Sequence, residues 1–142
     1  MNFAMIAKVQ GALYLLLAIA MMIPVGVGWI FKEVDQIKGF SFAIGITGTI
    51  GILLSLIKPK VQTLRLKESI LLVLLTWFGF GFFGALPYLF CDIFSFTDAI
   101  FETISGFTTT GSSVLVYIEH TAKSILFWRS LTQWLGGMGI EI

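Results

Sequence analysis

The sequence has little of what builds catalytic or metal centres. It contains one cysteine, Cys91, and one histidine, His120, among 142 residues. A single cysteine excludes an internal disulfide. One cysteine and one histidine are also too few for a structural Cys/His metal site. No acid, base and nucleophile stand together in a recognisable catalytic pattern, which argues against a membrane enzyme. We therefore expect no enzymatic activity and no resident cofactor.

Charge is also scarce. Asp, Glu, Lys and Arg together make up 12% of the chain, whereas soluble domains are about a quarter charged. The formal net charge of +1 gives no indication of nucleic acid binding. In contrast, 57% of the residues are hydrophobic and the mean hydropathy is +0.96. This composition is typical of a chain whose solvent is the lipid bilayer.

Three uncharged runs are long enough to cross a membrane. They are residues 9–31, 39–57 and 69–91, with 23, 19 and 23 residues. As helices they would measure about 28 to 35 Å, against about 30 Å for the hydrocarbon core. A fourth run, residues 124–140, is interrupted by Arg129 and is barely long enough for a span. We expect it to be a helix that enters the membrane and is cut short.

The charged residues between these runs predict an orientation. The N-terminus and the loop 58–68 fall on one side of the membrane, and the loops 32–38 and 92–123 fall on the other. The first side carries five positive residues, which are Lys8, Lys58, Lys60, Arg65 and Lys67. The second carries three, diluted by six acidic residues. The positive-inside rule therefore predicts a cytoplasmic N-terminus, with the segment 92–123 starting and ending outside.

The segment 92–123 contains a helical pattern followed by hydroxyl residues. Apolar residues recur at three- and four-residue spacing, Ser95 and Asp98 form a capping-box pattern, and Gly106 is a typical helix stop. A helix over residues 96–105 would be about 15 Å long, which is half a bilayer. The threonines, glycine and serines of 108–113 favour an extended or turning chain, and 114–118 an apolar strand-like or coil segment.

Two interpretations fit this segment. In one, the short helix enters the membrane and the hydroxyl residues return as a re-entrant loop. Its helix C-terminus, its carbonyls and its hydroxyls would then suit a dehydrated alkali cation, and Gly111 would permit the required backbone twist. In the other, an amphipathic helix lies on the outer surface and a Ser/Thr/Gly turn follows it.

Two blocks of sequence favour the first interpretation. "ALPYLFCDIFSFTDAIFETISGFTTTGSSVL", followed by "ILFWRSLTQWLGGMGI", closely resembles the Trk-type potassium uptake proteins, the TrkH-like branch of the Trk/Ktr/HKT superfamily. The resemblance implies an all-α membrane protein of a prokaryotic cytoplasmic membrane, multi-pass, that takes up K+ by symport or by a channel-like route. Family members resemble four fused potassium-channel units, each with an outer helix, a pore helix, a filter strand and an inner helix.

The resemblance also implies boundaries and site residues. Residues 1–67 would hold two leading transmembrane helices and a cytoplasmic loop, and residues 68–142 the first pore repeat. That repeat would consist of an outer helix 69–90, a pore helix 96–105, a filter 108–112 and an incomplete inner helix 124–142. The transported K+ would bind at Thr109 and Thr110, and the cation-binding filter would also include Gly111 and Thr108. The expected partners are lipid, the remaining pore repeats and a cytoplasmic nucleotide-binding subunit of the Trk-A type.

The chain departs from the family in having one filter segment. One filter strand supplies a quarter of a coordination ring. Either four copies of the chain assemble, or the chain is the N-terminal fragment of a longer transporter, which the short last helix favours. The alternative function is that of a non-transporting truncated membrane fragment or a helical assembly partner.

Arg129 also allows two interpretations. Its side chain can extend to the lipid headgroups at the outer interface, which is the commoner outcome. It can instead act as a structural charge behind the filter, paired with an acid such as Asp98 or Glu102.

Overall fold

The computed structural model describes residues 1–141, with side chains to residue 138, and all regular structure in it is helical. The elements are α1 (Phe3–Ile30), α2 (Val34–Ser55), α3 (Leu66–Phe90), α4 (Phe96–Phe107), the 3₁₀ helix η1 (Ile118–His120) and α5 (Lys123–Glu141). No strand occurs in the described part of the chain. The predicted all-α class is confirmed.

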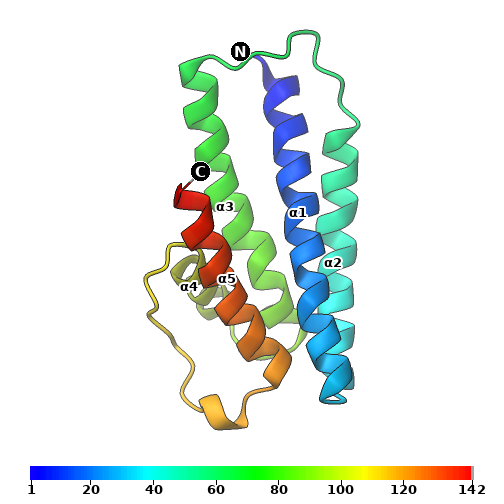
Figure 1. Cartoon of the computed structure of the whole chain (residues 1–142), viewed down its shortest axis with the longest axis vertical. Helices are drawn as coiled ribbons and strands as arrows, with labels where there is room; N and C mark the ends of the chain where they lie inside the picture. Colours follow the sequence, from blue (N-terminus) through cyan, green and yellow to red (C-terminus); the bar gives the residue numbers. More distant parts are fainter. Residues whose placement is uncertain (142) are drawn as a thin grey trace.

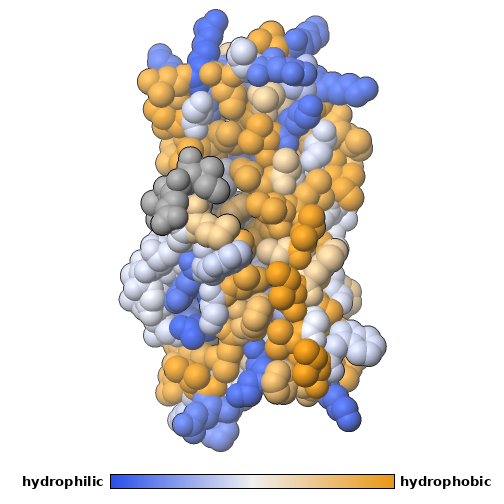
Figure 2. Space-filling view, viewed as in Figure 1, coloured by the Kyte–Doolittle hydropathy of each residue, from blue (hydrophilic) through white to orange (hydrophobic). Residues whose placement is uncertain are grey.

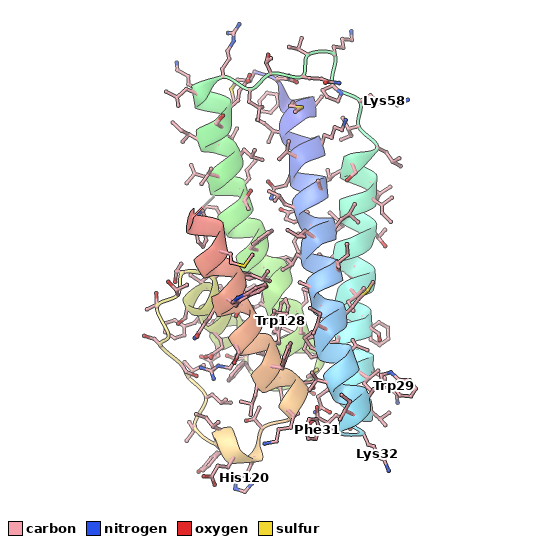
Figure 3. The ribbon with its side chains drawn as sticks, viewed as in Figure 1. Trp29, Phe31, Lys32, Lys58, His120 and Trp128 are labelled. Carbon is pink, nitrogen blue, oxygen red and sulfur yellow. The ribbon has the colours of Figure 1, made fainter. Side chains whose placement is uncertain are left out.

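Three helices have the length and composition of membrane spans. Among residues 1–141 these are α1, α2 and α3, with 28, 22 and 25 residues, and each contains most of one predicted uncharged run. They lie side by side along the long axis of the molecule (Figure 1). Apolar atoms cover most of the visible flank and hydrophilic ones gather at both ends (Figure 2). Lys58 lies at one end, and Lys32 and His120 lie at the other (Figure 3).

The two leading helices pack closely because glycines meet at their crossing. A Cβ added at Gly11 of α1 would lie 2.6 Å from the backbone nitrogen of Ser55 and 2.7 Å from the carbonyl oxygen of Gly51, both on α2. Small residues allow such backbone approach between membrane helices, where packing replaces the hydrophobic effect as the main attraction. The leading pair therefore forms a tight hairpin.

The remaining helices join this hairpin through a buried tryptophan. Trp128 of α5 is fully buried, and its indole nitrogen donates a hydrogen bond of 3.0 Å to the carbonyl oxygen of Gly84 on α3. Its ring lies edge-on to Phe40 of α2, with centroids 6.1 Å apart. One residue thus connects α5 to both α2 and α3.

Several predicted boundaries need correction. The short helix α4 continues to Phe107, two residues beyond the predicted 96–105, because Gly106 does not stop it. The segment 108–112 is not a strand but an irregular turn, and residues 114–117 are coil before η1. Helix α3 starts at Leu66 and α5 at Lys123, before the predicted residues 69 and 124. Residue 142, the last of the predicted inner helix, lies outside the described residues.

Candidate cation site

Helix α4 is a half-length element at one side of the bundle, and the chain turns back after it (Figure 1). Its 12 residues correspond to about 18 Å of helix. The hydroxyl of Ser95 caps its first turn by accepting a hydrogen bond of 3.3 Å from the backbone N–H of Asp98, as the sequence predicts. From the end of the molecule that carries His120, α4 runs beside α3 and α5, and the loop that follows it turns back partway along the long axis (Figures 1 and 3).

The turn after α4 is a helix-ending motif with a threonine in the place that glycine usually occupies. Thr109 has a φ of +57°, and its N–H bonds to the carbonyl of Gly106 at 2.9 Å. The N–H of Thr110 bonds to the carbonyl of Ser105 at 3.0 Å. These two bonds define a Schellman motif, whose left-handed position normally takes glycine. A β-branched residue there is strained, and such strain concentrates at functional sites.

Gly111 provides a second left-handed position two residues later. Its φ is +79°, and nothing lies within 4 Å of the position where a Cβ would be. The predicted need for glycine is therefore confirmed, and its cause is the backbone conformation alone, not lack of space.

The hydroxyl residues of this region divide into two groups. One group holds the turn together: Ser105 donates to the carbonyl of Ser112 at 2.6 Å, and Thr108 donates to the carbonyl of Ile104 at 2.7 Å. The hydroxyls of Thr108 and Thr110 lie 2.7 Å apart. The second group, Thr109 and Ser112, is exposed. Figure 2 shows paler, polar atoms on the flank where this loop lies.

The backbone oxygens of the turn are available. Within residues 1–141, no protein donor reaches the carbonyl oxygens of residues 108–111. Uncompensated carbonyls inside a bilayer are costly unless water, protein or an ion faces them. The turn can therefore offer up to four carbonyl oxygens to a cation.

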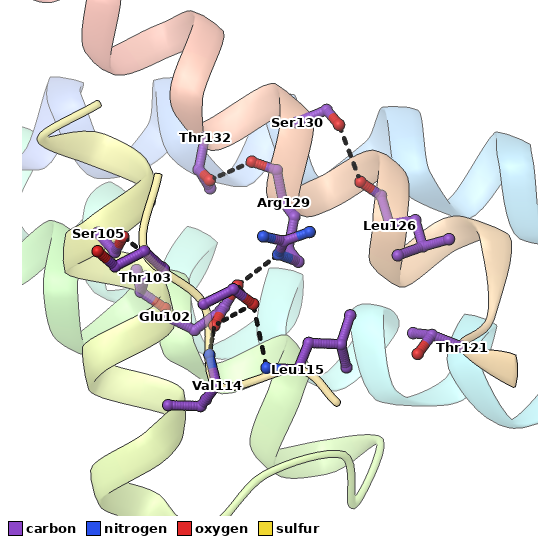
Figure 4. A network of polar contacts seen from close by, with 12 residues as sticks. Glu102, Thr103, Ser105, Val114, Leu115, Thr121, Leu126, Arg129, Ser130 and Thr132 are labelled. Atoms are coloured by element: carbon purple, nitrogen blue, oxygen red, sulfur yellow. Dashed lines mark hydrogen bonds and ion pairs between the residues drawn. The ribbon is translucent and has the colours of Figure 1, made fainter. Parts of the chain in front are cut away.

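A buried carboxylate fixes the far side of the loop. Glu102 of α4 is 3% exposed, and it accepts hydrogen bonds from the Ser113 hydroxyl at 2.9 Å and from the Val114 N–H at 3.0 Å. The guanidinium of Arg129 on α5 forms an ion pair with the same carboxylate (Figure 4). Charged partners strengthen such hydrogen bonds. One carboxylate thus connects α4, the returning loop and α5.

Helix α5 also packs directly against the end of α4. A Cβ at Gly136 would overlap the carbonyl group of Phe107, and a Cβ at Gly106 would overlap the hydroxyl of Thr132. Gly106 is therefore needed for contact between helices and not as the predicted helix stop.

The structure brings most of the predicted residues together and changes the role of two. Thr109, Thr110 and Gly111 share the exposed turn. Thr108 is the last, half-buried cap of α4, and its hydroxyl is occupied by its own helix. Arg129 pairs with Glu102, so the favoured expectation of an extension to lipid headgroups was wrong.

The sequence analysis missed the supporting contacts of Ser105 and Ser113. Only Glu102 carried a signal, as an acidic residue within an otherwise amphipathic, membrane-directed helix.

Comparison with known proteins gives a consistent result. A sequence model of the TrkH family, described as "Cation transport protein", matches residues 38–141. The Trk system potassium uptake proteins TrkH of Halomonas elongata and of Escherichia coli K12 are 35% and 36% identical over the whole chain, which covers 30% of each of them. An uncharacterized cation transporter, MJ1485 of Methanocaldococcus jannaschii, is 45% identical over 60% of the chain, which is 18% of that protein.

A solved structure is similar as well. The crystal structure of the potassium transporter TrkH from Vibrio parahaemolyticus matches 99% of the chain with a TM-score of 0.91 and 33% sequence identity, over 30% of that protein's chain. The present chain therefore spans about 30% of the length of the relatives it matches.

Proposed function

The chain belongs to the TrkH family of cation transport proteins, and from this premise we propose that it supplies one filter segment of a potassium uptake pore. Residues 68–142 form the first pore repeat, in which α3 is the outer helix, α4 the pore helix and α5 the inner helix. Residues 1–67 form the leading pair and its following loop. K+ moves through the filter of the complete transporter, driven by the membrane potential at about 2.3 kcal/mol per charge per 100 mV.

The observation that carries this proposal is the row of free carbonyls in the turn after α4. The carbonyl oxygens of Thr109, Thr110 and Gly111, with that of Thr108 beside them, replace part of the water shell of the ion. The negative end of the α4 helix dipole points to the same turn and adds to the attraction for a cation. The carboxylate of Glu102 holds the loop from behind, so that these oxygens keep their spacing.

The rest of the site comes from outside these residues. One turn provides a quarter of the ring implied by a four-unit pore, so three further filter segments surround the same axis, from a longer chain or from further copies. The complete protein lies in the cytoplasmic membrane with the end that carries Lys58 towards the cytoplasm, as the distribution of positive charge supports. A nucleotide-binding subunit of the Trk-A type docks at that side.

Two glycine substitutions test the role of the turn. Residues 1–142 replace the matching part of the Escherichia coli relative, and K+ uptake is measured in cells that lack other uptake systems. Gly111→Ala should lower K+ uptake and K+ selectivity over Na+, because alanine disfavours a φ of +79°. Gly45→Ala is the matched control, since it also has nothing within 4 Å of an added Cβ but lies in a regular helix.

Membrane insertion and protein level are measured for both variants. Wild-type uptake and selectivity in Gly111→Ala would contradict the proposed coordination by the turn.

A further inference from the structure

The N-terminus of α5 has no cap of its own. The residue at its N-cap position is Ala122, whose carbonyl accepts the first helical bond, from Leu126, at 3.1 Å. Alanine has no side-chain oxygen to accept bonds from the free N–H groups of the first turn. Those groups need acceptors from elsewhere in the chain.

Glu33 provides them from a distance of 90 residues in sequence. Its carboxylate accepts the backbone N–H of Lys123 at 2.6 Å, the N–H of Ser124 at 3.0 Å and the hydroxyl of Ser124 at 2.6 Å. Ser124 is buried, whereas Glu33 is half-buried. A negative group at the positive end of a helix dipole is also favourable in charge. The contact therefore uses both oxygens of one carboxylate on one helix end.

The backbone holds Glu33 firmly in this position. It lies in the short turn between α1 and α2, where Lys32 has a φ of +58° and the N–H of Glu33 bonds to the carbonyl of Gly28 at 2.8 Å. The side chain of Glu33 makes no capping bond to α2, so its carboxylate is directed to α5 alone. The leading hairpin is thus joined to the last helix of the pore repeat at their outer ends.

We propose that Glu33 is a positioning residue that fixes α5, and through α5 the loop of the cation site, to the leading helix pair. From the contact at Ser124, α5 runs about 8 Å to Arg129, whose guanidinium holds Glu102. Glu102 in turn holds Ser113 and Val114 of the returning loop. The leading pair, which supplies no atom to the filter, thereby sets where the inner helix starts. The functional part of this inference rests on the proposed function.

Two variants distinguish a bond that joins two helices, here called the joint (Glu33 to Lys123 and Ser124), from a simple helix cap. Glu33→Gln removes the charge and places an amide NH2 against N–H donors. Ala122→Ser gives α5 a local cap from its own chain. If the joint matters, Ala122→Ser will not correct the effect of Glu33→Gln, because a local cap does not restore the bonds between the first turn of α5 and the hairpin. Glu119→Gln is the control, an exposed acid at the same end of the molecule.

The experiment measures a distance in the full 142-residue chain. Spin labels are placed at two exposed positions, Lys38→Cys on α2 and Ser130→Cys on α5, in a Cys91→Ser background, and the distance distribution is recorded by pulsed EPR in lipid. Glu33→Gln should broaden the distribution, with or without Ala122→Ser, while Glu119→Gln leaves it narrow. A narrow distribution in Glu33→Gln, or one restored by Ala122→Ser, would overturn the proposal. Circular dichroism confirms that helix content is retained.

Uptake in the chimera with the Escherichia coli relative gives the functional result. Glu33→Gln should reduce K+ uptake about tenfold or more, as loss of a hydrogen bond to a charged group implies, and Ala122→Ser should not restore it. Uptake restored by Ala122→Ser would contradict the joint. A wild-type chimera without uptake would count against the proposed function, whereas the distance measurement would still decide the role of Glu33.

Discussion

Replacing Glu102 with glutamine should release the loop that follows α4 and the proposed cation site. The substitution keeps the size of the side chain but removes the charge opposite Arg129, and it places an amide NH2 where Ser113 and Val114 donate. Only 2% of the Glu102 side chain and 19% of the Arg129 side chain are exposed. Breaking a buried ion pair by removing one partner costs about 3 to 5 kcal/mol. Because Arg129 keeps some exposure, we expect about 3 kcal/mol, at the low end of this range.

Hydrogen exchange at one amide measures this loss directly. The N–H of Val114 bonds to the carboxylate of Glu102 in the wild type, so it should be protected. At 1.4 kcal/mol per factor of ten, a loss of about 3 kcal/mol corresponds to exchange about a hundredfold faster in Glu102→Gln. Arg129→Gln should accelerate exchange at the same amide, since it leaves the carboxylate buried without its charge partner. Glu119→Gln, at an exposed site, should have no effect.

The double variant tests whether the two residues act as a pair. Combining Glu102→Gln with Arg129→Gln should cost less stability than the sum of the single changes, because no buried charge is left unpaired. Wild-type exchange at Val114 in both single variants would refute the reasoning. In that case the ion pair would not hold the loop, and the arginine side chain would reach the lipid headgroups as its position in the sequence first suggested.

Three further outcomes follow from the structure. Gly136→Ala should destabilise the protein by about 1 to 3 kcal/mol, the usual cost of overpacking, because the new Cβ overlaps the Phe107 carbonyl. Gly137→Ala is the control and should be tolerated, since its Cβ meets its nearest neighbour at 3.8 Å. Thermal unfolding in detergent compares the stability of the two variants. Thr109→Gly should raise stability by about 1 kcal/mol through relief of the left-handed strain while lowering uptake in the chimera, and a loss of stability would contradict the strain. Burial alone would raise the pKa of the Glu33 carboxyl, but its hydrogen bonds to the start of α5 outweigh this and lower the pKa below its ordinary value. The contact of Glu33 with α5 is therefore complete above the ordinary carboxyl pKa and should be lost as pH falls through the lower, folded-state pKa. In the wild type, acid should broaden the EPR distance distribution. In Glu33→Gln the distribution is already broad, so acid should not change it.

The sequence predicted the helices well because membrane helices follow a length rule. Uncharged runs must match the hydrocarbon core, so α1, α2 and α3 were located from composition alone. The start of α4 was equally predictable, since a capping serine acts on its own first turn. Such signals are local, and each can be read without knowledge of the neighbouring helices.

Gly106 shows where local signals fail. A glycine near the end of a helix usually ends it, yet here the helix continues and Thr109 takes the left-handed position instead. The reason lies in α5, because Thr132 occupies the space that a side chain at 106 would need. The partner of Arg129 was undecided for the same reason. Asp98 and Glu102 are four residues apart on one helix face, and only the packing of α5 determines which of them the guanidinium reaches.

Ser105 and the hydroxyl residues of the tract 108–113 can now be divided by function. Three hydroxyls form hydrogen bonds within this region. Those of Ser105 and Thr108 donate to backbone carbonyls, and that of Ser113 donates to Glu102. Each bond satisfies a polar group that lipid could not satisfy. Within the described residues, no protein donor reaches the carbonyl oxygens of residues 108–111. Free carbonyl oxygens can be satisfied by hydrogen donors such as water or by a cation, and the proposed filter uses them for the cation.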